Sequence, residues 1–225
     1  MEALWSWWQT WSASVSEAVA RGTSGLDFGA LLALAAALGW ASGLRLYAVV
    51  FLTGLAGVLG WIVLPTGLQV LMHPAVLGAS GFMLVVEFFA DKIPVVDSLW
   101  DSIQGFVRVP AGAALAAAVF GADSTAMALA AGLLGGSLAA TSFATKAATR
   151  AAANTSPEPF SYWSLSLLED GLVVGALWLA TQHPVLFGIV LCIVVVLMGV
   201  LLWTLFRFLR AVVRRIGGLV GMARA

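Results

Sequence analysis

The segment that most constrains this chain runs from Pro184 to Phe206, where 23 consecutive residues carry no charge. A helix of about 20 apolar residues crosses the hydrocarbon core of a bilayer, which is about 30 Å thick. The composition agrees, because 61% of the residues are hydrophobic and 10% are charged, whereas about a quarter of a soluble domain is charged. The chain is therefore predicted to be an integral membrane protein, with the lipid bilayer as its first partner.

Similar apolar runs recur along the chain, and each must form a helix because the bilayer offers no water to the backbone. They predict an all-α bundle of about seven helices in a single transmembrane domain, 25–206. Six is the alternative, because the first two runs are one stretch interrupted at Arg45, which allows two short spans, a broken helix or a re-entrant pair. The expected spans are 26–43, 45–63, 74–91, 106–122, 125–147, 163–182 and 184–206.

Two short likenesses within the chain suggest an internal repeat. Residues 34–39 (LAAALG) resemble residues 129–135 (LAAGLLG), and residues 73–78 (HPAVLG) resemble residues 183–188 (HPVLFG). With seven spans both pairs have the same orientation, which predicts two parallel three-helix repeats of the kind that build many transporters. Pairs of glycines four residues apart also recur, and such pairs favour close helix packing, inside the bundle or in a homo-oligomer.

The lysines and arginines indicate the orientation, because cytoplasmic loops of membrane proteins are enriched in them. Five arginines follow the last span and place the C-terminus in the cytoplasm. Counting back through seven spans puts Arg45, Lys92, Arg108, Lys146 and Arg150 on the same side. The chain is therefore expected to be a multi-pass protein with a cytoplasmic C-terminus.

The segments outside the bundle are predicted to be amphipathic helices at the membrane surface. Residues 1–24 are rich in tryptophan and are expected on the outer surface, whereas residues 207–225 form a basic cytoplasmic tail. Residues 95–108 are expected to form a further surface helix on the cytoplasmic side. The uncharged segment 64–73 is expected to be an external loop.

Several charged residues lie within or beside the expected spans, where an ionised group at the bilayer centre costs about 2.5–3.5 kcal/mol unless it is paired or hydrated. Glu87 and Asp91 are four residues apart and share one helix face. Glu169 and Asp170 are adjacent, so at least one of them faces the bundle interior. The candidates for a polar pathway, or for a set of static ion pairs, are Arg45, Glu87, Asp91, Lys92, Lys146, Arg150, Asn154, Glu169 and Asp170.

The same sequence argues against several other functions. Eleven basic and eleven acidic residues balance, so the chain lacks the positive field that nucleic acid requires. The sequence contains no cofactor-binding motif and no catalytic motif, so neither a cofactor nor an enzymatic activity is expected. Asp97 and Asp101 have a spacing that can hold a divalent metal, although a solvated helix face explains the same spacing.

Four motifs together resemble a known family. They are GWASGLRLY at 39–47, EFFADKIPVVDSLWD at 87–101, NTSPEPFS at 154–161 and LLED at 167–170. In this order they resemble an uncharacterised family of bacterial multi-pass membrane proteins, domain of unknown function 4126, over about residues 25–205. The resemblance implies the bacterial inner membrane as the location and brings no activity with it.

A second resemblance is to cation exchangers that carry an E-x-G-D-K-[ST] motif in each half. Here Glu87 and Asp91 are one residue further apart than in that motif, Ile93 replaces its hydroxyl residue, and the second half has no copy. These departures argue against transfer of a manganese or calcium site to this chain.

Three functions follow as hypotheses. The first is a transporter or channel for an ion or small solute, with the charged candidates lining its path. The alternative is a structural or assembly subunit of the membrane, in which the charges form static ion pairs. A metal-dependent enzyme that acts on lipids, with Asp97 and Asp101 as metal ligands, is the third.

Overall fold

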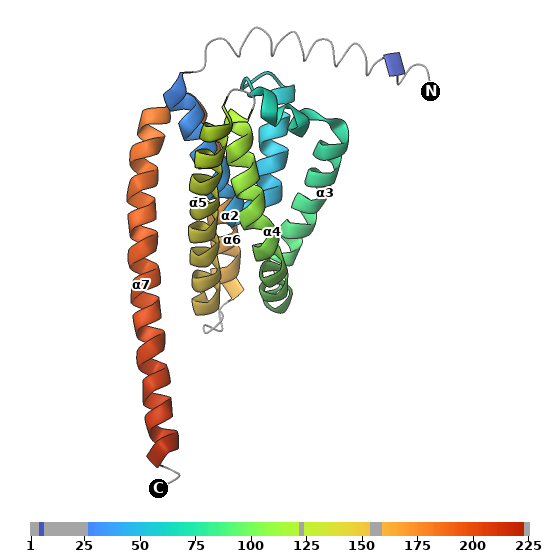
Figure 1. Ribbon diagram of the computed structural model, residues 1–225. Coiled ribbons are helices and arrows are strands. Elements are labelled where there is room, and N and C mark those ends of the chain that lie inside the picture. Colours follow the sequence, from blue (N-terminus) through green and yellow to red (C-terminus); the bar gives the residue numbers. More distant parts are fainter. Residues whose placement is uncertain (1–4, 7–26, 122–123, 154–158, 223–225) are drawn as a thin grey trace.

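The computed structural model describes residues 5–6, 27–121, 124–153 and 159–222, and the helices in these ranges form a bundle that runs mostly along one direction (Figure 1). The all-α, multi-pass architecture expected from the sequence is confirmed. The expected surface helix 1–24 falls outside the described residues, apart from Trp5 and Ser6. The elements are α2 (Phe28–Val58), η1 (Thr66–Met72), α3 (Pro74–Ala90), α4 (Pro94–Phe120), α5 (Thr125–Ala153), α6 (Pro159–Gln182) and α7 (Pro184–Met222).

Helix α2 bends at Arg45, whose backbone angles of φ −147° and ψ 86° are not helical. The Phe28 ring lies 5.9 Å from the Phe120 ring at the end of α4. The second half of α2 leads into η1, where Gly67 lies against Ala118, also near the end of α4. Both ends of α2 therefore lie at the same end of the bundle, with Arg45 at the turn between the two halves.

This bend changes the count of spans. The expected spans 26–43 and 45–63 are the two helical halves of α2, which meet at the kink at Arg45. Because their outer ends lie at the same end of the bundle, they match the broken helix or re-entrant pair that the sequence allowed. Among the described residues, five helices are long and apolar enough to cross a membrane, or six if the bent pair of η1 and α3 is one span. The alternative of six spans agrees with the larger count. The internal repeat stays a prediction.

The core of the bundle is the first half of α2, which is rich in alanine and glycine and packs against α4 and α5. A Cβ atom at Gly39 would lie 2.4 Å from the Cα atom of Gly135, and a Cβ at Gly43 would lie 2.0 Å from the Ser142 hydroxyl. The helices therefore approach at these glycines as the spacing predicts. Among the described residues, Gly171 and Gly175 on α6 have no such neighbour within 4 Å, so the predicted close packing does not occur there for that pair.

Three other segments differ from the simple pattern of spans and loops. The expected external loop 64–73 contains η1, whose leucines Leu68 and Leu71 are buried in the core. The expected surface helix 95–108 is continuous with the following span in α4, which contains Pro110 without ending there. Helix α7 continues from its span into the basic tail, and its exposed apolar side chains form a surface suited to lipid.

Candidate functional site

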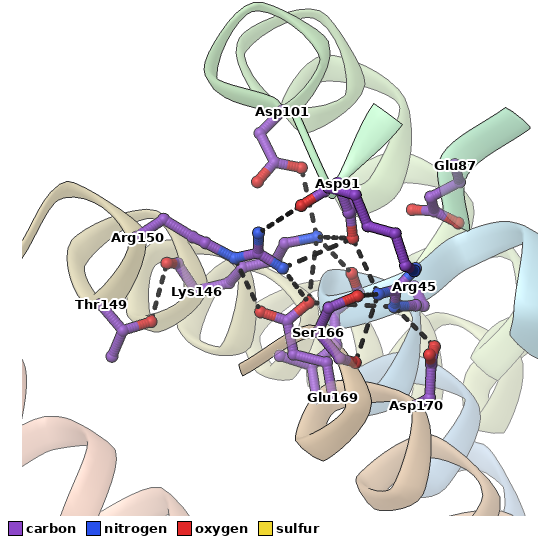
Figure 2. Close-up of polar contacts among 12 residues, drawn as sticks. Arg45, Glu87, Asp91, Asp101, Lys146, Thr149, Arg150, Ser166, Glu169 and Asp170 are labelled. Carbon is purple, nitrogen blue, oxygen red and sulfur yellow. Dashed lines mark hydrogen bonds and ion pairs between the residues drawn. The ribbon is translucent and has the colours of Figure 1, made fainter. Parts of the chain in front are cut away.

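Charged side chains from five helical segments meet inside the bundle (Figure 2). We call this cluster the charged network. All of its members are buried except Asp170, whose side chain is 30% exposed. Its members are Arg45 of α2, Glu87 at the end of α3, Asp91 directly after α3, Asp101 and Arg108 of α4, Lys146 and Arg150 of α5, and Glu169 and Asp170 of α6.

Arg45 joins the bend of α2 to α3 and α6. Its Nη2 lies 2.8 Å from Asp91 Oδ2, and its Nε lies 2.8 Å from Asp170 Oδ1. The same Nη2 donates a hydrogen bond of 2.7 Å to the Ser166 hydroxyl. Since a guanidinium presents several donors in a fixed plane, Arg45 can hold three partners from two other segments at the point where its own helix is broken.

The two cations of α5 are one helical turn apart and share their carboxylate partners. Lys146 Nζ lies 3.3 Å from both Asp101 Oδ1 and Glu169 Oε2, and 3.5 Å from Asp91 Oδ2. Arg150 forms a two-pronged pair with Glu169, with Nε–Oε1 and Nη2–Oε2 distances of 3.3 and 3.1 Å. In Figure 2, Lys146 lies in the centre of the network, between the guanidinium groups of Arg150 and Arg45.

Glu87 occupies one side of the network and pairs with Arg108. The distance from Glu87 Oε1 to Arg108 Nη2 is 2.6 Å, and Arg108 Nη1 donates to Asp101 Oδ1 at 2.7 Å. Neither Glu87 nor Arg108 has an exposed side chain. Asp101 links this branch to the centre of the network through Lys146.

Asp91 is a carboxylate with three cations around it. It follows the last residue of α3 and lies within 3.5 Å of nitrogen atoms of Arg45, Lys146 and Arg150. Burial by itself would raise the pKa of Asp91, but Lys146, Arg45 and Arg150 together hold it below its ordinary value of 3.8. The three cations therefore favour the ionised form of Asp91.

Most of the candidate residues named from the sequence meet in the network, whereas Lys92 does not join it. Lys92 donates to the Phe88 carbonyl at 3.1 Å and lies over the Phe88 ring, and no ion pair of Lys92 occurs among the described residues. Asn154 and the side chain of Asp97 lie outside the part of the chain that can be described. No three His, Cys, Asp or Glu residues of the described part are grouped as a metal site, and Asp101 contacts two cations.

Sequence reasoning missed two participants. Arg108 was placed in the expected surface helix 95–108, yet it is fully buried and pairs with Glu87. The signal for it was its position seven residues after Asp101, since residues two helical turns apart share a face. Ser166 gave no signal, because a single serine in an apolar helix is unremarkable until Arg45 is brought against it.

Some polar atoms of the charged network have no hydrogen-bond partner among the described residues. Five carboxylates meet four cations, and Glu87 Oε2, Asp91 Oδ1 and Arg45 Nη1 are buried without a hydrogen-bond partner among the described residues. Unpaired polar atoms in a region of low dielectric are costly. Glu87 Oε2 and Asp91 Oδ1 therefore remain as acceptors for a small ion or a proton.

Together these observations define an all-α, multi-pass membrane protein with a buried network of ion pairs at a broken helix. The family described as "Domain of unknown function (DUF4126)" matches residues 32–204, which is most of the chain, and the protein belongs to it. A search of curated proteins and a search of solved structures each found no match.

Proposed function

We propose that this protein is a transporter or channel for an ion or small solute, and that its path passes the charged network. The observation that carries the proposal is the break in α2 at Arg45, inside a membrane-spanning bundle and against charges from two other helical segments. Transporters commonly bind their substrates where membrane helices are discontinuous, because the broken backbone and the charges there can contact an ion.

Two further features support this function. Intramembrane ionisable residues are usually functional, because each one is costly to insert. Eight of the nine network residues lie in candidate membrane-spanning helices or in the bent pair of η1 and α3. Asp170 is partly exposed whereas its partner Arg45 is completely buried, so this pair connects the surface of the bundle with its interior. The unpartnered atoms Glu87 Oε2 and Asp91 Oδ1 offer additional acceptors deeper in the network.

The direct test is ion flux in liposomes that contain the purified protein. Gradients of H⁺, Na⁺, K⁺ and Cl⁻ are imposed in turn, and the flux is compared with that of protein-free liposomes. We expect flux of at least one ion, which Arg45→Gln and Asp170→Asn reduce to the protein-free level while the variants remain folded. Arg207→Gln, which changes an exposed cation beside Trp203, is the matched control and should retain the flux. An absence of flux in every gradient contradicts ion transport.

A second function, a structural subunit with static ion pairs, is favoured by one specific observation. Glu87 is 0% exposed and Glu169 4% exposed, and each of them is paired with a cation. For a structural subunit, every substitution that breaks a pair should lower stability, and restoring the charge balance with a second substitution should recover it. For a transporter, such a double substitution should recover stability and leave the protein inactive.

We propose the bacterial inner membrane as the location, with the C-terminus in the cytoplasm. Arginines concentrated in and after the last part of α7 support this orientation by the positive-inside rule. Single cysteines at Gly60 and Ala225, introduced after replacement of Cys192, test the proposal with a thiol reagent that cannot cross membranes. We expect labelling of position 60 in intact cells and of position 225 only after permeabilisation. Labelling of position 225 in intact cells contradicts the orientation.

A further inference from the structure

A cavity of about 200 Å³ lies between the two halves of α2 and helix α6, apart from the charged network. Leu52, Thr53 and Ala56 line it from the second half of α2, and Trp178 and Thr181 line it from α6. None of the residues that line it carries a charge.

Thr53 is the unusual residue of this cavity. Its side chain is buried, with 2% of the residue exposed, yet its hydroxyl has no hydrogen-bond partner among the described residues. A buried hydroxyl without a partner is unfavourable. Other helical serines and threonines of this chain avoid that cost by donating to a carbonyl of the preceding turn. They are Ser42, Ser80, Ser137, Thr141, Thr145, Thr149 and Thr181.

We propose that this cavity binds a small uncharged molecule with an apolar ring or chain and one polar group, and that the polar group bonds to the Thr53 hydroxyl. The ligand is uncharged because no side chain around it could neutralise a charge in this apolar setting. Its size follows from the volume, since an apolar cavity of about 150 Å³ accommodates benzene, and about 200 Å³ leaves room for one polar substituent. Trp178 provides an aromatic wall that suits such a ring.

The proposal does not depend on transport through the charged network. The cavity and the network share α2 and α6 but no residue. A protein that moves no ion can still bind a molecule at Thr53, and the binding experiment below does not measure flux.

The test is fluorine NMR on the purified full-length protein in detergent, with 4-fluorobenzyl alcohol and 4-fluorotoluene as the probes. These molecules differ by one hydroxyl. We expect saturable binding of the alcohol, displaced by unlabelled benzyl alcohol. Thr53→Val should weaken it by about fivefold, the effect of one ordinary hydrogen bond, and should leave the affinity for fluorotoluene unchanged.

Two variants serve as controls. Thr181→Val removes a hydroxyl in the same cavity that already bonds within its own helix, and it should not change the affinity for the alcohol. Thr53→Ser keeps the hydroxyl and should retain the preference for the alcohol over fluorotoluene.

Three results would overturn the proposal. The first is no saturable binding of the alcohol to the unaltered protein, which leaves water as the partner of Thr53. The second is equal affinity of the unaltered protein for both probes, which indicates a purely apolar occupant such as a lipid tail. The third is equal weakening by Thr181→Val and Thr53→Val, which removes the specific role of Thr53.

Discussion

Arg45 Nη2 lies 2.8 Å from Asp91 Oδ2, and neither side chain has any exposed surface. The two residues are far apart in the chain, and their contact ties the bend of α2 to the end of α3. Since Asp170 and Ser166 bind the same guanidinium, one arginine connects three helical segments. The bend of α2 is therefore joined to the charged network through the contacts of Arg45.

The first prediction concerns this arginine. Arg45→Gln should lower the free energy of unfolding by about 3–5 kcal/mol, the usual cost of removing one partner from buried ion pairs. Asp91 and Asp170 would then keep their charges and lose their shortest pairs. Thermal unfolding in detergent measures the effect, and Arg207→Gln at the exposed end of α7 should change stability little. A loss of stability no larger than that of Arg207→Gln contradicts the prediction that the ion pairs of Arg45 stabilise the fold.

The second prediction concerns Glu87, whose contact is with Arg108. Glu87→Gln should lower the free energy of unfolding by about 1–3 kcal/mol, because Arg108 keeps Asp101 as a partner. Arg108→Gln in the same chain should recover part of that loss, whereas Lys146→Gln should not, since Lys146 pairs with other carboxylates. Double-mutant cycles on thermal stability measure both couplings. Recovery by Lys146→Gln alone contradicts the observed pairing.

The third prediction concerns acid. Because the pKa of Asp91 is held below its ordinary value of 3.8, its charge stabilises the folded state. That stability is fully present above about pH 4 and is lost as the pH falls through the lowered pKa of the folded state. Asp91→Asn should therefore be less stable than the unaltered protein at neutral pH and should lose less stability in acid. Unfolding midpoints of both proteins, measured from pH 6 to pH 2, test this prediction. A parallel fall of the two midpoints with decreasing pH contradicts it.

The fourth prediction concerns the close approach of α2 and α5. Gly39→Ala should destabilise the protein by about 1–3 kcal/mol, as overpacking commonly does, because the new Cβ would meet the backbone of Gly135 at 2.4 Å. Gly199→Ala on α7 is the matched control, since no other described part of the chain lies within 4 Å of its Cβ position. It should stabilise the helix slightly. Equal effects of the two substitutions in thermal unfolding contradict the close packing at Gly39.

Much of the fold could be predicted because each membrane helix has a simple signature, a long apolar run bounded by glycine, proline or charge. The run from Pro184 to Phe206 is the clearest case, and it is helical throughout. The position of the bend at Arg45 could be predicted from the sequence, but its geometry could not. A charged residue between two short apolar runs is compatible with two short spans, a broken helix or a re-entrant pair. The network that holds Arg45 involves residues up to 125 positions away.

The members of the site could be predicted better than their pairing. Ionisable residues in apolar segments are rare, so Glu87, Asp91 and Glu169 were recognisable by their positions alone. Their partners depend on which faces of the helices turn toward one another, and the pattern of one sequence does not contain that information. Arg108 was missed for this reason, because it ends the segment 95–108, whose mixture of polar and apolar residues suggests a surface helix.

The most direct test of the proposed path is the accessibility of Ser166, which is fully buried against Arg45. With Cys192 replaced by serine, Ser166→Cys is exposed in membranes to a charged thiol reagent that cannot cross lipid. Val196→Cys, on the lipid-facing side of α7, serves as the control. A polar path predicts that the reagent labels position 166 in folded protein while position 196 stays unlabelled. No labelling of position 166 from either side of the membrane, in protein that is labelled there once unfolded, would contradict the path and leave a set of static ion pairs.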